Sequence, residues 1–210
     1  MRIAGDEYDA AASVLLEIDF DYLLRWGHAH LVARLHERLQ GRLTDKELKM
    51  SSLTNLGNCY YSLGEYRPAI DYQEQALAIL REIGDRKGEG AVLGNLEICY
   101  EWLGEYRHAI DYQVQSLAIR REIGDRQGEG NTLGNLGICY KFLGEYSRVI
   151  DYHEQSLAIA REIGYPYLEA NELTTLGELD TATGQLAEAR KHFADAGRAR
   201  INHQPKISLA

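Results

Sequence analysis

The chain repeats itself every 40 residues. Segments 85–124 and 125–164 differ at only twelve positions, and segment 45–84 follows the same pattern. A fixed period of this length is typical of solenoids, in which each repeat packs mainly on its two neighbours. The sequence therefore predicts a repeat array, an architecture that more often presents a binding surface than a catalytic centre.

Each repeat predicts two helices joined by short turns. In segment 45–84 the first helix carries apolar residues on one face at Leu53, Leu56, Tyr60 and Leu63. Gly64 and Gly84 are expected to end the two helices, because glycine readily takes the left-handed conformation found just after a helix. Asp85 and Asp125 are placed to cap the first helices of the next two repeats.

Small side chains and thiols recur at fixed places in the repeats. We expect close helix crossings at Gly57, Ala69, Ala76, Ala109, Ala118 and Gly137. The three cysteines, Cys59, Cys99 and Cys139, share one slot in successive repeats. Equivalent residues of stacked helices lie roughly 10 Å apart, beyond the reach of about 7 Å between the Cα atoms of a disulfide. They are therefore predicted to be buried thiols.

Composition argues against several functions. The net charge of −9 does not favour a nucleic-acid partner, because such proteins concentrate lysine and arginine. No apolar stretch reaches membrane-spanning length, so we expect a cytoplasmic protein without a membrane partner. The sequence contains no phosphate-binding loop, no metal-ligand spacing and no catalytic constellation, so neither a cofactor nor enzymatic activity is predicted. Gly88-Glu89-Gly90 predicts a weak helix start, and the acidic residues are interpreted as solvent-facing.

The predicted fold is an all-α superhelix of about five antiparallel helical hairpins. The predicted parts are a degenerate N-terminal hairpin at 1–44, repeats at 45–84, 85–124 and 125–164, a divergent repeat at 165–200, and a tail at 201–210. The ends of such an array expose apolar faces, so end-to-end self-association stays open.

The repeats resemble the tetratricopeptide repeat. Leu56, Gly57 and Tyr60, followed by Ala69 and Ala76, fall at that family's spacing. The 40-residue length looks most like the subclass found in the Pins and LGN spindle-orientation adaptors and in many bacterial signalling proteins. The resemblance is strong over 45–164 and weakens over 165–200. It implies a protein or peptide partner bound along a concave groove.

The N-terminal segment carries a second resemblance. Residues 6–42, from Tyr8-Asp9-Ala10-Ala11 to Leu35-His36-Glu37-Arg38-Leu39, resemble the segment that joins an NTPase module to tetratricopeptide repeats in bacterial STAND-type regulators. This resemblance implies a second function, in which the chain is the sensor, autoregulatory or oligomerisation arm of such a regulator.

The first resemblance also implies binding residues. In this family the first helix of each hairpin lines the groove. The corresponding residues are Asn55, Asn58, Tyr61 and Ser62 in the first repeat, Asn95, Ile98, Glu101 and Trp102 in the second, and Asn131, Asn135, Ile138, Lys141 and Phe142 in the third.

Two features of these residues suggest a binding role. Asn55, Asn95 and Asn135 form a row of amides that could pair with a peptide backbone, and Gly94 and Gly134 precede two of them. The alternatives are a structural hydrogen bond between helices or simple inheritance through duplication. Trp102 and Phe142 vary between repeats and are aromatic, as binding hot spots often are, although packing between hairpins would also explain them.

Overall fold

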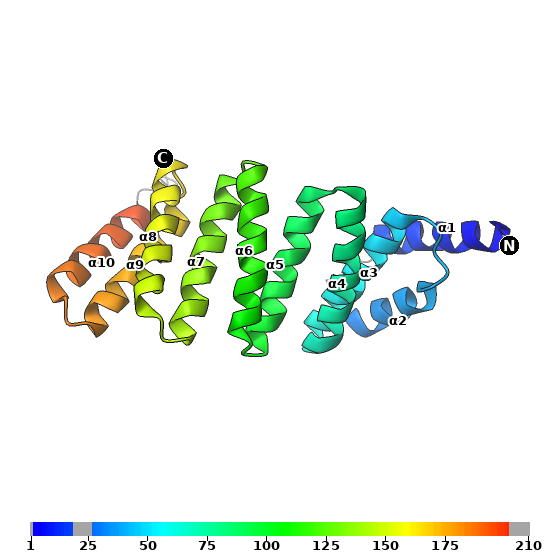
Figure 1. Cartoon of the computed structure of the whole chain (residues 1–210), viewed down its shortest axis with the longest axis horizontal. Coiled ribbons are helices and arrows are strands. Elements are labelled where there is room, and N and C mark those ends of the chain that lie inside the picture. The colour runs from blue at the N-terminus through cyan, green and yellow to red at the C-terminus, as the bar shows by residue number, and fades with distance from the viewer. Residues whose placement is uncertain (1, 19–26, 202–210) are drawn as a thin grey trace, which may run out of the picture. The chain divides into compact units, whose positions relative to one another are not determined.

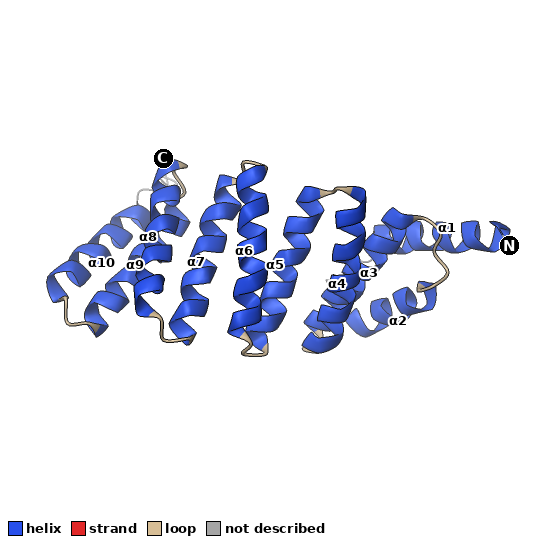
Figure 2. Cartoon of the chain, viewed as in Figure 1, coloured by secondary structure: helices blue, strands red, loops and turns tan. Residues whose placement is uncertain are grey.

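The computed structural model describes residues 2–18 and 27–201, which form helices joined by short turns and contain no strand (Figures 1 and 2). The predicted all-α class is confirmed. The helices of this part are α1 (Arg2–Ile18), α2 (Ala29–Leu39), α3 (Lys46–Ser62), α4 (Tyr66–Ile83), α5 (Arg86–Trp102), α6 (Tyr106–Glu122), α7 (Arg126–Phe142), α8 (Tyr146–Glu162), α9 (Pro166–Ala182) and α10 (Leu186–Ile201).

The helices pack as consecutive antiparallel pairs within two compact units, Met1–Ile119 and Arg120–Ala210. In the first unit α2 packs on α3, α3 on α4, and α4 on α5. In the second unit α7 packs on α8, α8 on α9, and α9 on α10. Within each unit these helices therefore contact their neighbours in the sequence, as expected for a repeat array.

The helix ends follow the predicted local chemistry. The Asp85 side chain accepts a hydrogen bond from the backbone N–H of Gly88, and Asp125 does the same for Gly128. Gly64 and Gly84 both adopt positive φ, which allows the chain to turn sharply into the next helix. The starts of α5 and α7 and the ends of α3 and α4 are thus encoded within a few residues of sequence.

The interior consists of leucines with small residues between them. Leu53, Leu56, Leu93, Leu96, Leu133 and Leu136 are almost fully buried, and so are the three cysteines, which are free thiols as predicted. The prediction for Ala118 is wrong, because that residue is exposed. Ser116, the residue before Leu117, is buried on α6 instead. It lies 40 residues after Ala76 and fills the same small-residue slot.

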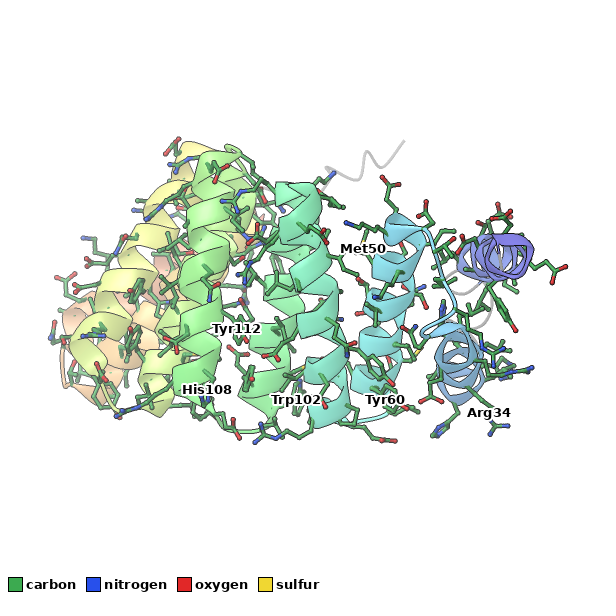
Figure 3. All side chains as sticks on the ribbon, turned by 45° about the vertical axis from the view of Figure 1, so that its right-hand side comes forward. Arg34, Met50, Tyr60, Trp102, His108 and Tyr112 are labelled. Carbon is green, nitrogen blue, oxygen red and sulfur yellow. The ribbon has the colours of Figure 1, made fainter. Side chains whose placement is uncertain are left out.

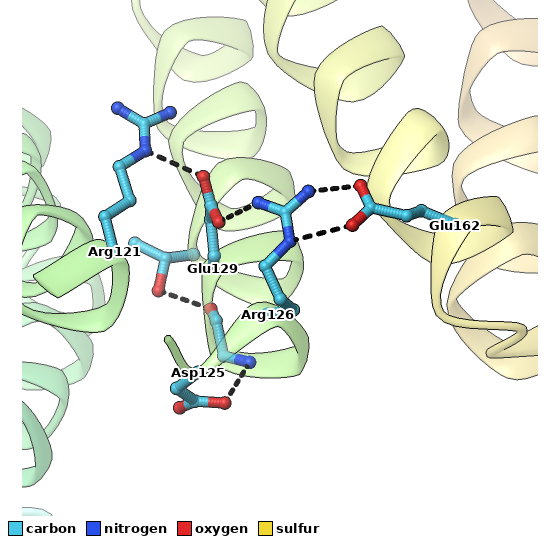
Figure 4. A network of polar contacts seen from close by, with 7 residues as sticks. Arg121, Asp125, Arg126, Glu129 and Glu162 are labelled. Carbon is cyan, nitrogen blue, oxygen red and sulfur yellow. Dashed lines mark hydrogen bonds and ion pairs between the residues drawn. The ribbon is translucent and has the colours of Figure 1, made fainter. Parts of the chain in front are cut away.

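Buried carboxylates overturn the prediction that the acidic residues face solvent. Glu129 is buried at the start of α7 and accepts hydrogen bonds from Arg121 and Arg126, and Arg126 also pairs with Glu162 of α8 (Figure 4). Glu89 repeats the arrangement at the start of α5, with Arg81 at 2.9 Å and Arg86 at 2.5 Å. These ion pairs and the aspartate caps stabilise the glycine-rich helix starts.

Pairs of tyrosines join the two helices in the hairpins α3–α4, α5–α6 and α7–α8. The ring centroids of Tyr100 and Tyr112 lie 5.4 Å apart in a stacked arrangement, and two further pairs repeat it, Tyr60 with Tyr72 and Tyr140 with Tyr152. The Tyr112 hydroxyl donates to Glu74 of α4 at 2.8 Å, so this residue also joins neighbouring hairpins (Figure 3).

Candidate functional site

The first helices of the hairpins carry all of the predicted binding residues. We use the name first-helix face for two surfaces, one formed by α3 and α5 in the first unit and one formed by α7 and α9 in the second. A hollow lies on each of them. The α3–α5 pocket is small, about 30 Å³, and the α7–α9 pocket is larger, about 300 Å³.

The α3–α5 pocket brings four predicted residues together. It is lined by Asn58, Tyr61, Asn95, Ile98, Gln73 and Cys99. Asn95 donates from Nδ2 to Oδ1 of Asn58 at 3.2 Å, and Gln73 donates to the same oxygen at 3.0 Å. The amide of Asn95 therefore makes a structural hydrogen bond between α5 and α3. A structural hydrogen bond between helices was the alternative to a peptide-binding role for the row of asparagines.

Trp102 is the most exposed aromatic residue predicted for this face in the first unit. Its side chain is 63% exposed, yet it is held in place by two contacts (Figure 3). The indole stacks on Tyr66 with ring centroids 5.8 Å apart and planes inclined by 8°, and its Nε1 donates to the Tyr61 hydroxyl at 3.3 Å. Packing between hairpins and exposure to solvent are thus combined in one residue.

The other charged and aromatic predictions differ in their surroundings. Glu101 is half-buried and accepts a hydrogen bond from Gln113 at 3.1 Å, so its carboxylate is directed partly toward α6. Lys141 lies 3.9 Å from Glu178 of α9, and both side chains are exposed. Phe142 is as exposed as Trp102.

The α7–α9 pocket contains three predicted residues and several that the sequence reasoning missed. The predicted residues are Asn131, Asn135 and Ile138 of α7. The others are Gly134, His153, Tyr165, Tyr167, Leu168, Asn171, Glu172 and Thr175. Asn171 lies 40 residues after Asn131, so extending the repeat alignment into 165–200 would have found it. Asn55, which was also predicted to bind a partner, lines neither pocket and is half-buried on α3.

A buried pair of hydrogen-bonded side chains, His153 and Glu172, lines this pocket. His153 of α8 lies 2.5 Å from Glu172 of α9, measured from Nδ1 to Oε2, and both side chains are buried. A Cβ atom added at Gly134 would lie only 2.7 Å from Oε1 of Glu172. Gly134 therefore provides the space for this carboxylate, whereas nothing lies within 4 Å of the corresponding position at Gly94.

A third hollow, which is an apolar groove, lies between α1 and α2 in the first unit. It measures about 380 Å³, is lined mainly by Val14, Leu15, Ile18, Leu35 and Leu39, and is bordered by Arg42, whose guanidinium lies 4.9 Å from the Tyr8 ring centroid. The lining is largely apolar, unlike that of the two pockets on the first-helix face.

Comparison with protein families identifies the repeat. A family model for the tetratricopeptide repeat matches residues 30–82 and 88–162, which is more than half of the chain. The chain belongs to this family. The match starts within α2, so the degenerate N-terminal region contributes at least one helix with family character. No curated protein sequence matches the tetratricopeptide chain.

Solved structures share its fold. BtubC from P. vanneervenii superposes with a TM-score of 0.75 at 20% identity, over 99% of this chain and 97% of that one. The STAND protein with a tetratricopeptide repeat sensor from Pyrococcus horikoshii superposes with a TM-score of 0.76 at 20% identity, over 92% of this chain and 31% of that one. A Rap protein in complex with Competence and Sporulation Factor has a TM-score of 0.61 at 16% identity, over 85% of this chain and 52% of that one. These likenesses show the fold.

Within 2–18 and 27–201 no helix is both long and apolar enough to cross a membrane. No group of three or more metal-ligating side chains occurs in the same part of the tetratricopeptide array.

Proposed function

We propose that the chain is a non-catalytic protein–protein interaction scaffold that binds a segment of a partner protein on its first-helix face. The observation that carries the proposal is the environment of Trp102. A large apolar ring held on Tyr66 and Tyr61 has already lost most of its conformational freedom, so binding a partner costs it little further entropy. Aromatic residues in such settings dominate binding hot spots.

The amides on this face support the same proposal. Asn95 uses Nδ2 to reach Asn58, but among the described residues its Oδ1 accepts no hydrogen bond. The preceding residue is Gly94, and nothing lies within 4 Å of the place where its Cβ atom would stand. An extended segment could approach closely there and donate a backbone N–H to the oxygen.

Peptide display on the intact chain tests the proposal. Peptides selected on the wild type should bind more weakly to Trp102→Ala and Asn135→Ala variants, and a Val114→Glu variant should bind them normally. Val114 is exposed on the second helix α6, and glutamate occupies the equivalent positions 74 and 154. Equal affinity for all four proteins would show that the segment binds elsewhere.

A second function is favoured by one comparison. The likeness to the Pyrococcus horikoshii STAND protein covers 92% of this chain, and that protein carries its tetratricopeptide repeats as a sensor. We therefore retain the alternative that this chain is the sensor, autoregulatory or oligomerisation arm of a STAND-type NTPase. The coding sequence next to Met1 tests it, because a STAND regulator requires an NTPase module in the same polypeptide.

A further inference from the structure

The α7–α9 pocket has a buried carboxylate, Glu172, whose charge no lysine or arginine of the pocket lining balances. Glu172 is 5% exposed, and among the described residues that line the pocket there is neither lysine nor arginine. The other buried carboxylates at helix starts are treated differently, because Glu89 and Glu129 each accept hydrogen bonds from two arginines. Lys141 is nearby on α7 but pairs with Glu178.

The hydrogen-bond partner of Glu172 is His153, and this contact does not neutralise the negative charge of the carboxylate. With Glu172 ionised, the short contact requires the proton on Nδ1 of His153, since a carboxylate only accepts. The other ring nitrogen, Nε2, has no hydrogen-bond partner among the described residues and faces Gly137. A second proton on Nε2 would bury an N–H group without an acceptor, which is costly. The neutral ring, and so one net negative charge on the pair, fits this geometry.

This pair departs from the repeat. His153 replaces the glutamines at 73 and 113, and Glu172 stands where the earlier repeats have Ser52, Val92 and Thr132. A buried, incompletely balanced carboxylate does not stabilise a fold. Gly134 leaves room for its Oε1, and the asparagines at 131, 135 and 171 line the same pocket with amide groups.

We infer that the α7–α9 pocket receives a cationic side chain, lysine or arginine, of the segment that binds the array. The inference rests on the proposed function and specifies its partner as one with a basic residue. The ammonium or guanidinium group would give Glu172 the cationic partner that Arg121 and Arg126 provide for Glu129. The amide oxygens of the asparagines and the hydroxyl of Thr175 would accept its remaining N–H groups. The exposed ring of Tyr167 would cover its aliphatic stem.

The test uses single amino acids as probes, so that it does not depend on finding the partner. The intact chain is titrated with the Nα-acetyl amides of lysine, arginine and glutamine at matched ionic strength, and backbone amides are followed by NMR. Both cationic probes should shift the signals of Asn131, Asn135, Asn171 and Glu172, and the glutamine probe should not. Equal responses to all three probes, or no response to either cation, would overturn the inference.

Variants locate the response. Glu172→Gln removes the charge and should abolish the response to both cations. Gly134→Ala, which fills the space beside Oε1, should weaken it, and Gly94→Ala makes the same change on α5 and should leave it intact. Thermal melts establish that each variant is folded. A cation response that persists in both Glu172→Gln and Gly134→Ala would also refute the assigned pocket.

Displayed peptides separate this inference from the proposed function. Replacing the basic residue of a selected peptide by glutamine should weaken its binding to wild type about ten- to a hundred-fold, and should have little effect with Glu172→Gln. Selected peptides that bind Trp102 but tolerate this replacement would leave the scaffold function standing and overturn the basic pocket. Failure to select any peptide would count against the scaffold, and the amino-acid titration would still decide the pocket.

Discussion

Asn95 of α5 donates a hydrogen bond to Asn58 of α3, with 3.2 Å between Nδ2 and Oδ1. The same Oδ1 accepts from Gln73, whose side chain is almost completely buried. One oxygen thus connects three helices of two neighbouring hairpins. This arrangement makes Asn58 a structural residue of the face that was predicted to bind a partner.

Replacing Asn58 with alanine is expected to destabilise the fold. The buried Gln73 amide and Asn95 would both lose an acceptor, which costs about 1–3 kcal/mol. Urea unfolding measures the change. The matched control is Asn131→Ala, which restores the residue found at position 91 and lies at an exposed site, so it should change the unfolding free energy by less than about 0.5 kcal/mol. Equal midpoints for both variants would contradict the structural role of Asn58.

Trp102→Ala is expected to affect binding more than folding. Loss of the stack on Tyr66 should lower the unfolding free energy by about 0.5–1.5 kcal/mol. Loss of a hot-spot ring should weaken a displayed peptide by about 2 kcal/mol or more. Trp102→Phe introduces the aromatic residue of position 142 and should retain most of both. A variant that unfolds more easily but binds normally would make Trp102 a packing residue alone.

Glu129→Gln is expected to lose stability in a pH-dependent way. Burial alone would raise the pKa of Glu129, but hydrogen bonds and charge from Arg121 and Arg126 outweigh it and lower the pKa below its ordinary value of 4.5. A lowered pKa stabilises the folded state above pH 4.5, and this contribution disappears as the pH falls through the folded-state value.

The difference in unfolding free energy between wild type and Glu129→Gln should therefore be about 1–2 kcal/mol near neutral pH and shrink towards zero in acid. Unfolding curves at a series of pH values measure it. Glu154→Gln on α8 is the control, because Glu154 is exposed. A difference that stays constant down to pH 3 would rule out the ion pairs as its cause.

Replacing either of two equivalent glycines with alanine should change the stability of the fold, and in opposite directions. Gly94→Ala meets no neighbouring atom and should stabilise α5 by about 0.5–1 kcal/mol, because alanine favours the helix over glycine. Gly134→Ala places a methyl group against Glu172 and should be destabilising. Thermal melts of the two variants compare them directly. A gain in both would mean that Glu172 moves aside without cost.

The cysteines should be unreactive in the folded chain. All three are buried, and burial raises the pKa of Cys99 to about 11, so little of the reactive thiolate is present near neutral pH. A colourimetric disulfide reagent should label them slowly in buffer and rapidly in denaturant. Rapid labelling in buffer would indicate that the hairpins open readily.

The local features of the fold could be predicted from the sequence. The stop at Gly64 and the caps at Asp85 and Asp125 depend on residues within one helical turn, and the apolar spacing around Leu56 follows from helix geometry alone. Because the repeat recurs, each such prediction was supported by several copies of the same pattern.

The compensating exchanges inside the repeats could not be predicted in this way. Glu97 replaces a glycine in the second repeat and accepts a hydrogen bond from Gln113 of α6 at 3.3 Å. In the third repeat Gly137 leaves the space that the ring of His153 occupies. When the repeats are aligned, the two members of each exchange appear as unrelated differences, because they lie 16 positions apart on different helices.

The sequence by itself determined the all-α repeat and the helix ends, since periodicity and local backbone preference act over short distances. The face on which a partner is expected follows from the family resemblance. Only the tertiary structure decided which groups on that face are engaged and which have no counter-charge. The bond from Asn95 to Asn58, the stack of Trp102 on Tyr66, and the burial of Glu172 beside His153 each join different helices. Such pairings depend on how the helices pack in space. A sequence pattern does not record which residues of different helices come close together.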